Sequence, residues 1–411
     1  MFGQRCSASG YSSLPTLLAA LALTYLPVGL ALPLLAPFVE RTVGGGGAVV
    51  GLVIGAEAAT AMLVRPFAAG LGVRHGRRRV FLVAALIIAL ATLVNVISHD
   101  LWQIVAGRLV LGMGSGTLLA TSHPWAIELA GTERRGRALG QVGLVTFVAV
   151  GVGAPISLAM RSLGGFTVAW TFGGACALAG GLLIGLVAEP PADAAELASR
   201  GWQGMRAAVR PGMGVAAAFA GYASMASFAA LALSGRGVAG GAIVLTSCAA
   251  SLIAIRLLLG GVPDRFGVLP VAMTCASAEA SGLVLLAAAG SLPVAVVAGA
   301  LIGLGIANIY PAMGLRLMDG VRPEERTVAI GSLGAFIDLG YAGGAPLAGA
   351  VVAVAGYGSA FAVMAGVVLL AVTSVFFDPP GARVTARAAR KLRIGLHERK
   401  RSTRAAQVAR P

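Results

Sequence analysis

Four charged side chains interrupt long apolar stretches of this 411-residue chain. Glu57, Glu279 and Asp338 carry carboxyl groups, and Arg108 carries a guanidinium that stays protonated in proteins. A charge at the centre of a lipid bilayer costs about 2.5–3.5 kcal/mol on insertion scales, so each of these side chains needs a reason to be there. Reversible proton binding is such a reason, and we expect it of Glu57 and Asp338. The alternative for both is a protonated acid that only bonds a neighbouring helix.

The apolar stretches are long enough to hold these groups inside a membrane. The chain is 57% hydrophobic and 11% charged, whereas a soluble domain carries about 25% charged residues. A spanning helix needs about 20 apolar residues, and its backbone polar groups must pair within the helix. We therefore predict an all-α polytopic membrane protein with twelve transmembrane helices in two six-helix bundles. The predicted spans are 14–38, 47–71, 79–98, 101–124, 137–160, 164–187, 211–233, 238–261, 268–289, 292–314, 327–352 and 358–377.

The tripeptide Gly153-Ala154-Pro155 recurs as Gly344-Ala345-Pro346, 191 residues further along the chain. Arginine is scarce in the apolar part of this sequence, so arginine matches at the same offset are informative. Two equivalent apolar halves are the architecture of transporters that rock one half against the other. The further matches at this offset are Arg65 with Arg256, Arg74 with Arg265, Gly76 with Gly267, Arg135 with Arg326 and Gly140 with Gly331.

One long polar interruption divides six predicted spans from six. We expect an N-terminal bundle over 1–187, a cytoplasmic linker over 188–210, a C-terminal bundle over 211–378 and a basic cytoplasmic tail over 379–411. The net charge of +15 is concentrated in this tail and in alternate loops, which is the positive-inside pattern. We therefore expect a multi-pass protein of the cytoplasmic (inner) membrane with both termini in the cytoplasm. The basic residues are expected to meet lipid head groups and not nucleic acid.

Several segments have the spacing of motifs from one known family. Residues 65–79 resemble the loop between helices 2 and 3 of the major facilitator superfamily, and residues 260–267 resemble a second copy of it. Arg108 and the glycines after it resemble the helix-4 motif, and residues 151–155 resemble the helix-5 motif that is typical of exporters. Within the superfamily, residues 310–314 and 336–340 make the chain resemble bacterial efflux permeases of the arabinose-efflux or multidrug type. The positions that match conformational gating motifs are Arg65, Arg74, Gly76, Arg77, Gly153, Ala154, Pro155, Arg256, Gly260, Asp264, Arg265 and Gly267.

The chain departs from the superfamily pattern at three positions. Val73 stands where the family has an aspartate, Ala69 where it has a glycine, and Ala154 where glycine is commoner. The family aspartate pairs with basic residues and helix ends on the cytoplasmic side. The resemblance therefore implies that this clamp rests on Asp264 and Arg265 of the second copy.

The resemblance also implies a central cavity lined by helices 1, 4, 7 and 10, and a contact between helices 2 and 11. Glu57 and Asp338 lie on those last two helices. Arg108 is expected near the cavity, where it tunes the proton affinity of an acid or attracts an anionic substrate; a structural ion pair is the alternative. Few polar groups among many apolar ones favour a neutral or amphipathic ligand, although each such group also has a packing role as its alternative. The cavity candidates are Thr24, Tyr25, Ser115, Thr117, Tyr222, Ser224, Asn308 and Tyr310.

Other polar positions are expected to be structural. Glu279 lies on the peripheral helix 9 and is expected to bond within its own half. The loop arginines around Arg77 are expected to set topology and meet lipid head groups rather than to bind phosphate. His123, Trp125 and Glu128 lie near the cytoplasmic end of helix 4, where we expect an interfacial anchor, with a gate as the alternative.

These features predict a secondary active transporter that moves a small organic, sugar- or drug-like solute by alternating access, as a proton-coupled exporter. A proton symporter or a facilitator is the alternative within the same fold. A membrane enzyme would need clustered catalytic groups, but the four histidines are scattered and no metal or cofactor motif is present. A transport-inactive receptor would need an added folded domain. We expect a monomer whose partners are its substrate, protons and membrane lipids.

Overall fold

The structure is a computed structural model of the chain, and it describes residues 7–131, 134–189, 201–259, 262–318, 321 and 326–377. The secondary structure in these ranges is entirely helical, as the composition predicted. Nine of the described helices are long and apolar enough to cross a membrane, and α8 is a shorter apolar helix. The helices are α1 (Ser7–Val43), α2 (Gly47–His75), α3 (Arg77–Val96), α4 (Leu101–Ala130), α5 (Arg135–Leu183), α7 (Gly201–Ser234), α8 (Ile243–Leu259), α9 (Val262–Phe266), α10 (Val268–Ala288), α11 (Leu292–Met318) and α12 (Arg326–Phe376), with a 3₁₀ turn η2 (Ile184–Leu186).

Two of these helices are long enough to cross the membrane twice. α5 has 49 residues and α12 has 51, which at about 1.5 Å per residue is more than twice the ~30 Å hydrocarbon thickness. Each is interrupted by glycine with a positive φ, 74° at Gly165 and 80° at Gly356, a conformation that other residues rarely adopt. Divided at these breaks, the described helices account for the twelve predicted spans.

Several helices extend beyond their predicted apolar spans. α4 continues to Ala130, and α7 begins at Gly201, inside the range 188–210 that was expected to be a linker. Hydropathy marks only the part of a helix that lies in hydrocarbon, so it does not detect turns that continue into the aqueous boundary. Residues 190–200 and the predicted tail lie outside the described residues.

The 191-residue offset corresponds to repeated contacts in space. A Cβ on Gly153 would lie 2.6 Å from the carbonyl carbon of Gly29, and a Cβ on Gly344 would contact Ala220, which follows Gly29 by the same offset. α5 therefore crosses α1, and α12 crosses α7, with backbones in direct approach. The starts of α3 and α10 are also equivalent, because Gly76 and Gly267 precede them with φ of 88° and 86°.

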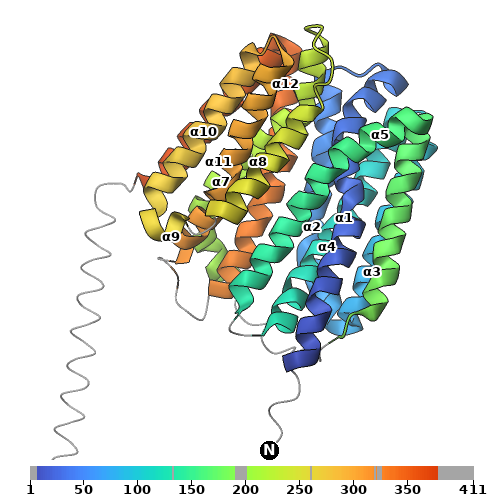
Figure 1. Cartoon of the computed structure of the whole chain (residues 1–411), viewed down its shortest axis with the longest axis vertical. Helices are drawn as coiled ribbons and strands as arrows, with labels where there is room; N and C mark the ends of the chain where they lie inside the picture. Colours follow the sequence, from blue (N-terminus) through green and yellow to red (C-terminus); the bar gives the residue numbers. More distant parts are fainter. Residues whose placement is uncertain are drawn as a thin grey trace, which may run out of the picture.

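The helices before and after the segment 190–200, here called the first and second halves, lie side by side (Figure 1). They contact each other mainly through α2 against α12 and α5 against α8. On α2, Gly47 faces Val352 and Gly51 faces Ala345 of α12. Because these glycines have no side chains, the two helices approach closely, as small residues allow in membranes.

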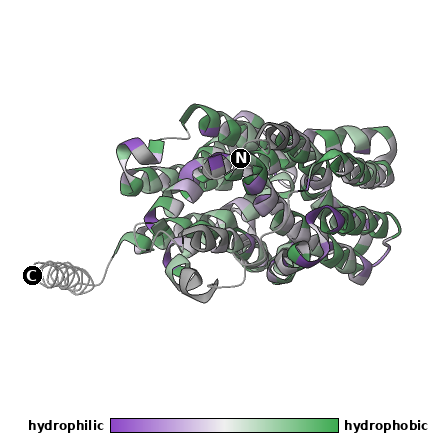
Figure 2. Ribbon diagram, turned by 90° about the horizontal axis from the view of Figure 1, so that it is seen from below, coloured by the Kyte–Doolittle hydropathy of each residue, from purple (hydrophilic) through white to green (hydrophobic). Residues whose placement is uncertain are grey.

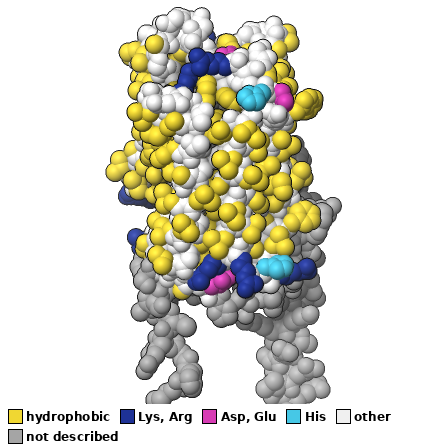
Figure 3. Space-filling view, turned by 90° about the vertical axis from the view of Figure 1, so that its right-hand side faces the viewer, with side chains coloured by type: hydrophobic (Ala, Val, Ile, Leu, Met, Phe, Trp, Pro, Cys, Tyr) yellow, Lys and Arg dark blue, Asp and Glu magenta, His cyan; other side chains and the backbone are white. Residues whose placement is uncertain are grey.

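The surface has the polarity that a bilayer requires. On the face shown in Figure 3, hydrophobic side chains cover the middle of the molecule, and charged and histidine side chains lie mostly toward its two ends. Seen from below, hydrophobic residues predominate along the helices (Figure 2). Leu86 and Leu90 of α3 are 58% and 55% exposed, which is favourable only where lipid replaces water.

Candidate functional site

Arg108 and Glu57 form a buried ion pair between α4 and α2. Nη2 of Arg108 donates to Oε2 of Glu57, and the side chains are only 1% and 10% exposed. Gly112 lies one turn further along α4, where a Cβ would contact the backbone carbonyl of Glu57. This glycine brings the helices close enough for the pair to form. Removing either partner would leave an uncompensated charge among apolar helices.

A second ion pair joins α2 of the first half to α12 of the second. Nε and Nη2 of Arg65 lie 2.8 and 2.9 Å from Oδ2 and Oδ1 of Asp338. The side chains are 21% and 10% exposed. Nη2 donates a hydrogen bond to Oδ1, and the contact of Nε with Oδ2 is ionic. A hydrogen bond between two ionised groups is stronger than one between neutral groups. The predicted contact between helices 2 and 11 is thus present, with an ion pair in it.

Tyr25 of α1 lies near both ion pairs. Electrostatic interactions connect its phenol with Glu57, Asp338 and Arg65. Of the predicted proton-coupling and cavity residues, the structure therefore brings Glu57, Arg108, Asp338 and Tyr25 into one region, where α1, α2, α4 and α12 meet.

Arg256 occupies the place on α8 that Arg65 has on α2. A Cβ on Gly143 would lie 3.7 Å from Nη1 of Arg256, and a Cβ on Gly334 would lie 3.7 Å from Nη1 of Arg65. These glycines are themselves 191 residues apart. The side chain that faces Arg256 is Phe147, whose ring centroid lies 5.7 Å from the guanidinium carbon.

Aromatic side chains fill the contact between α5, α7 and α12. The rings of Phe147 and Phe219 stack with centroids 6.1 Å apart, and Phe219 also packs against Tyr341 at 5.9 Å. Tyr222 lies edge-on to Tyr341 at 5.7 Å and is almost fully buried. Tyr222 was a predicted cavity residue, and the structure adds Phe147, Phe219 and Tyr341 to its surroundings.

Four predicted cavity hydroxyls bond to their own helices. Thr24 donates to the carbonyl of Ala20, and the other three likewise donate to carbonyls three or four residues earlier. Such bonds satisfy a hydroxyl inside an apolar helix without a ligand. A substrate role for them stays a prediction. The other three are Ser115, Thr117 and Ser224.

The remaining cavity candidates lie on α11. Asn308 donates to the carbonyl of Leu259 at 3.3 Å, and its buried Oδ1 has no hydrogen-bond partner in the described ranges. Tyr310 interacts electrostatically with both Arg256 and Arg65. The structure thus brings Tyr310 close to the two repeat-related arginines.

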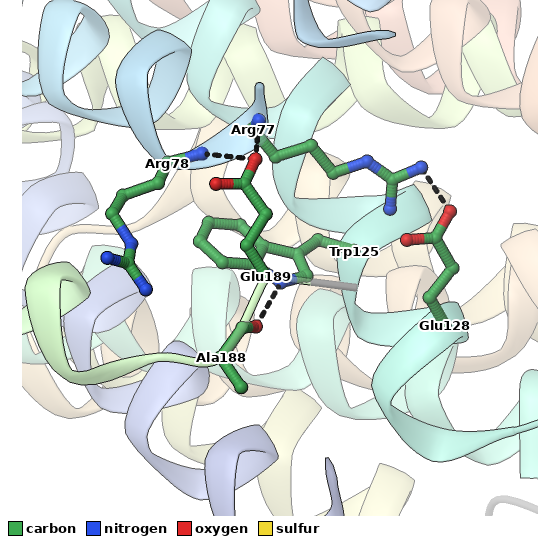
Figure 4. A network of polar contacts seen from close by, with 6 residues as sticks. All are labelled: Arg77, Arg78, Trp125, Glu128, Ala188 and Glu189. Atoms are coloured by element: carbon green, nitrogen blue, oxygen red, sulfur yellow. Dashed lines mark hydrogen bonds and ion pairs between the residues drawn. The ribbon is translucent and has the colours of Figure 1, made fainter. Parts of the chain in front are cut away.

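The end of the first half is fixed to the start of α3 (Figure 4). The backbone N–H groups of Arg77 and Arg78 both donate to Oε1 of Glu189. Free N–H groups and the helix dipole favour an anion at a helix N-terminus, and Gly76 leaves room for the carboxylate there. The guanidinium of Arg78 donates to the carbonyl of Val187.

The expected lipid contacts of Arg77 and Trp125 are wrong. The Arg77 side chain is 5% exposed and pairs with Glu128 of α4. Trp125 is fully buried, packs edge-on against Phe81 and donates from Nε1 to the carbonyl of Ala188 at 3.1 Å. The reason is that residues 187–189 fold back onto α3 and α4, which shields both side chains from the membrane surface.

Other gating positions are less informative. Arg74 and Arg265 are exposed, and Gly267 precedes α10. Gly260 and the side chain of Asp264 lie outside the described residues, so the clamp implied for Asp264 stays a prediction. Ala154 is buried at the α5 crossing and Pro155 lies beside it.

Glu279 differs from expectation. It is fully buried on α10, but neither carboxyl oxygen has a hydrogen-bond partner within the part of the chain that the structure describes. The predicted bond within its own half is therefore wrong. The neighbouring helices explain this, because Gly221 of α7 faces Oε1 and Gly305 of α11 faces the Cβ of Glu279, and neither glycine offers a side-chain donor. Among the described residues, no three His, Cys, Asp or Glu side chains group as metal ligands would.

Comparison with known proteins identifies the family. The Major Facilitator Superfamily model matches residues 17–261 and 212–409. The chain belongs to the Major Facilitator Superfamily (MFS). An uncharacterized MFS-type transporter of Salmonella typhimurium is 28% identical over 366 residues, covering 86% of this chain and 92% of that one. An uncharacterized MFS-type transporter of Burkholderia mallei is 30% identical over 365 residues, covering 86% and 89%.

Solved MFS transporters have the same fold. The nucleoside transporter NupG superposes with a TM-score of 0.70 at 16% identity, covering 89% of this chain and 99% of that one. The human organic anion transporter MFSD10 (TETRAN) gives 0.67 at 18% identity, covering 89% and 99%. The protein is thus a multi-pass membrane protein of a secondary transporter family, and not an enzyme.

Proposed function

We propose that this MFS protein exports a small organic, sugar- or drug-like solute by alternating access, driven by proton influx. In this proposal it is an efflux permease of the arabinose-efflux or multidrug type. It acts as a monomer in the cytoplasmic membrane, and the arginine-rich loops favour both termini in the cytoplasm. The scarcity of polar groups in the interior supports a neutral or amphipathic substrate.

The observation that carries the proposal is the hydrogen-bonded ion pair between Arg65 and Asp338. It connects two helices, α2 and α12, that belong to different halves and must separate when the halves rock. A proton on Asp338 would turn the carboxylate into a neutral acid and remove the ionic attraction to Arg65. Proton binding would thereby favour the state in which these two helices are apart. Proton binding would in this way determine the side of the membrane to which the substrate site opens.

The pair between Glu57 and Arg108 is the second coupling element. It lies within the first half, on α2 and α4, so a proton on Glu57 would free Arg108 without breaking a contact between halves. Glu57 shares α2 with Arg65, and Tyr25 interacts electrostatically with Glu57, Asp338 and Arg65, so a proton on one carboxylate would change the electrostatic environment of the other pair.

Transport in proteoliposomes tests this function. A thermal-shift screen of sugars, drugs and siderophore-like compounds on the purified chain would supply a substrate, because binding raises the apparent stability. An exporter that exchanges its solute for protons should accumulate this solute in liposomes with an acidic lumen. A symporter should do so only with an acidic exterior, and a facilitator in neither case. Transport that continues unchanged after a protonophore collapses the gradient would exclude proton coupling.

A further inference from the structure

Arg256 is a cation on the apolar helix α8. Among the described residues, no carboxylate pairs with it. Its repeat equivalent Arg65 holds the carboxylate of Asp338, but the position equivalent to Asp338 is occupied by Phe147. A cation–π contact at 5.7 Å stabilises a guanidinium and leaves its charge unneutralised. Arg256 is half-buried in the last turn of α8, and among the described residues it lacks the anion that its counterpart Arg65 has.

The buried carboxylates of the two ion pairs are already engaged. Asp338 makes both of its close contacts to Arg65, and Glu57 is paired with Arg108. Tyr310 of α11 interacts with Arg256 but carries no charge as a phenol. Among the described residues, no carboxylate is thus available to Arg256.

The side chains that pack beside Arg256 are aromatic. Phe147 stacks on Phe219 with 29° between the ring planes, and Tyr222 and Tyr341 continue the cluster. Stacked and edge-on rings of this kind favour a planar apolar group as a neighbour. A ligand that satisfies both features carries one negative charge and a planar ring.

We propose that Arg256 binds the anionic group of the transported solute, and that this solute is a singly charged amphipathic organic anion whose ring packs against Phe147. The proposal rests on the export function proposed above and specifies its substrate class. The solute's anionic group would take beside α8 the place that the carboxylate of Asp338 takes beside α2. Arg65 thus pairs with a carboxylate of the chain, whereas its repeat equivalent Arg256 would pair with the substrate.

Binding to the full-length protein in detergent tests this assignment. The probes are 1-naphthoate and its neutral isostere 1-naphthamide, which share a ring system and differ in charge. 1-Naphthoate should raise the melting temperature in a saturable manner, and 1-naphthamide should have little effect. Arg256→Gln should weaken naphthoate binding about 10- to 100-fold, the usual loss for a hydrogen bond to a charged group.

Two controls make the test specific. Arg161 also lies over a phenylalanine ring, that of Phe166 at 4.8 Å, so Arg161→Gln should leave naphthoate binding unchanged. Phe147→Asp would supply the missing carboxylate from within the chain. This variant should lose naphthoate binding and melt at a higher temperature than Phe147→Asn, which removes the ring without adding a charge.

The outcomes separate the hypotheses. An absence of any naphthoate shift, an equal shift with 1-naphthamide, or full binding by Arg256→Gln would each overturn the anion assignment. If Arg256→Gln does not fold, Phe147→Asp with normal naphthoate binding would overturn it as well. Binding in detergent needs no proton gradient, so a negative binding result would not contradict the proposed proton coupling. Conversely, flux that does not depend on a proton gradient would contradict the coupling but not the anion site.

Discussion

The ion pair between Arg65 and Asp338 can be tested by exchanging its two residues. Arg65→Gln and Asp338→Asn should each lower the free energy of unfolding by about 2 kcal/mol, because each leaves a mostly buried charge unpaired. The loss stays below that of a fully buried pair, since Arg65 is 21% exposed. The double variant Arg65→Asp with Asp338→Arg should regain most of it, as measured by thermal unfolding in detergent. Single variants as stable as the unmodified protein would contradict this role.

Glu279 allows the opposite prediction, a gain in stability. Its repeat equivalent is Ile88, which packs against Gly114 as Glu279 packs against Gly305. Glu279→Ile should raise the free energy of unfolding by about 1–3 kcal/mol, because it removes a buried polar group that has no partner among the described residues. Thermal unfolding measures the change, and Glu279→Gln is the matched variant that keeps the size and polarity. If Glu279→Ile is the less stable variant, the carboxyl has a partner.

The sequence identified the charged residues of the interior but not their partners. Glu57, Arg108 and Asp338 stand out because charge is rare in apolar runs. Arg65 and Asp338 are 273 positions apart in the chain. They pair only because α2 and α12 pack against each other and place both residues at the same depth in the membrane, which hydropathy does not predict. The repeat contained part of the signal, because it aligns Phe147 with Asp338.

At the scale of helices, the two Gly-Ala-Pro segments should be intolerant of side chains. Gly153→Ala and Gly344→Ala should each lower the free energy of unfolding by about 1–3 kcal/mol, because the added methyl groups overlap the backbones of α1 and α7. Gly140→Ala is the control, since a Cβ there meets nothing within 4 Å. It should be neutral or slightly stabilising in a helix. Equal melting temperatures for all three variants would refute the close crossings.

The positions of the spans were predictable, and the ends of the helices were not. Apolar runs predicted both segments of α5 and of α12, because the break at Gly356 falls between two predicted spans and the break at Gly165 lies at the start of one. The start of α7 at Gly201 was missed, since a helix at the membrane surface has no apolar run to mark it. Glu189 was read as part of a linker because its role depends on reaching the start of α3.

At the scale of the whole molecule, the contact of α2 with α12 should have to open during transport. A Cβ on Gly47 would lie 2.9 Å from the Cβ of Val352, so cysteines at both positions are close enough to form a disulfide with a small adjustment. Oxidation of the variant Gly47→Cys with Val352→Cys should abolish transport, and a reductant should restore it. The single variant Gly47→Cys should not respond to oxidation. Undiminished flux after complete cross-linking would mean that these helix ends need not separate.

The same close helix crossing occurs in both halves, at Gly153 and at Gly344. This repetition bears on the origin of the chain and on which of its residues have a function specific to one half. Duplication of a gene that encoded one half would account for glycines at the same backbone contact in both halves. Positions without such a backbone contact differ between the halves, as Phe147 and Asp338 do. Aligning one half of the chain with the other therefore separates two kinds of position without any homologous sequence. Residues that are identical in both halves maintain the shared fold, and residues that differ are candidates for a function specific to one half.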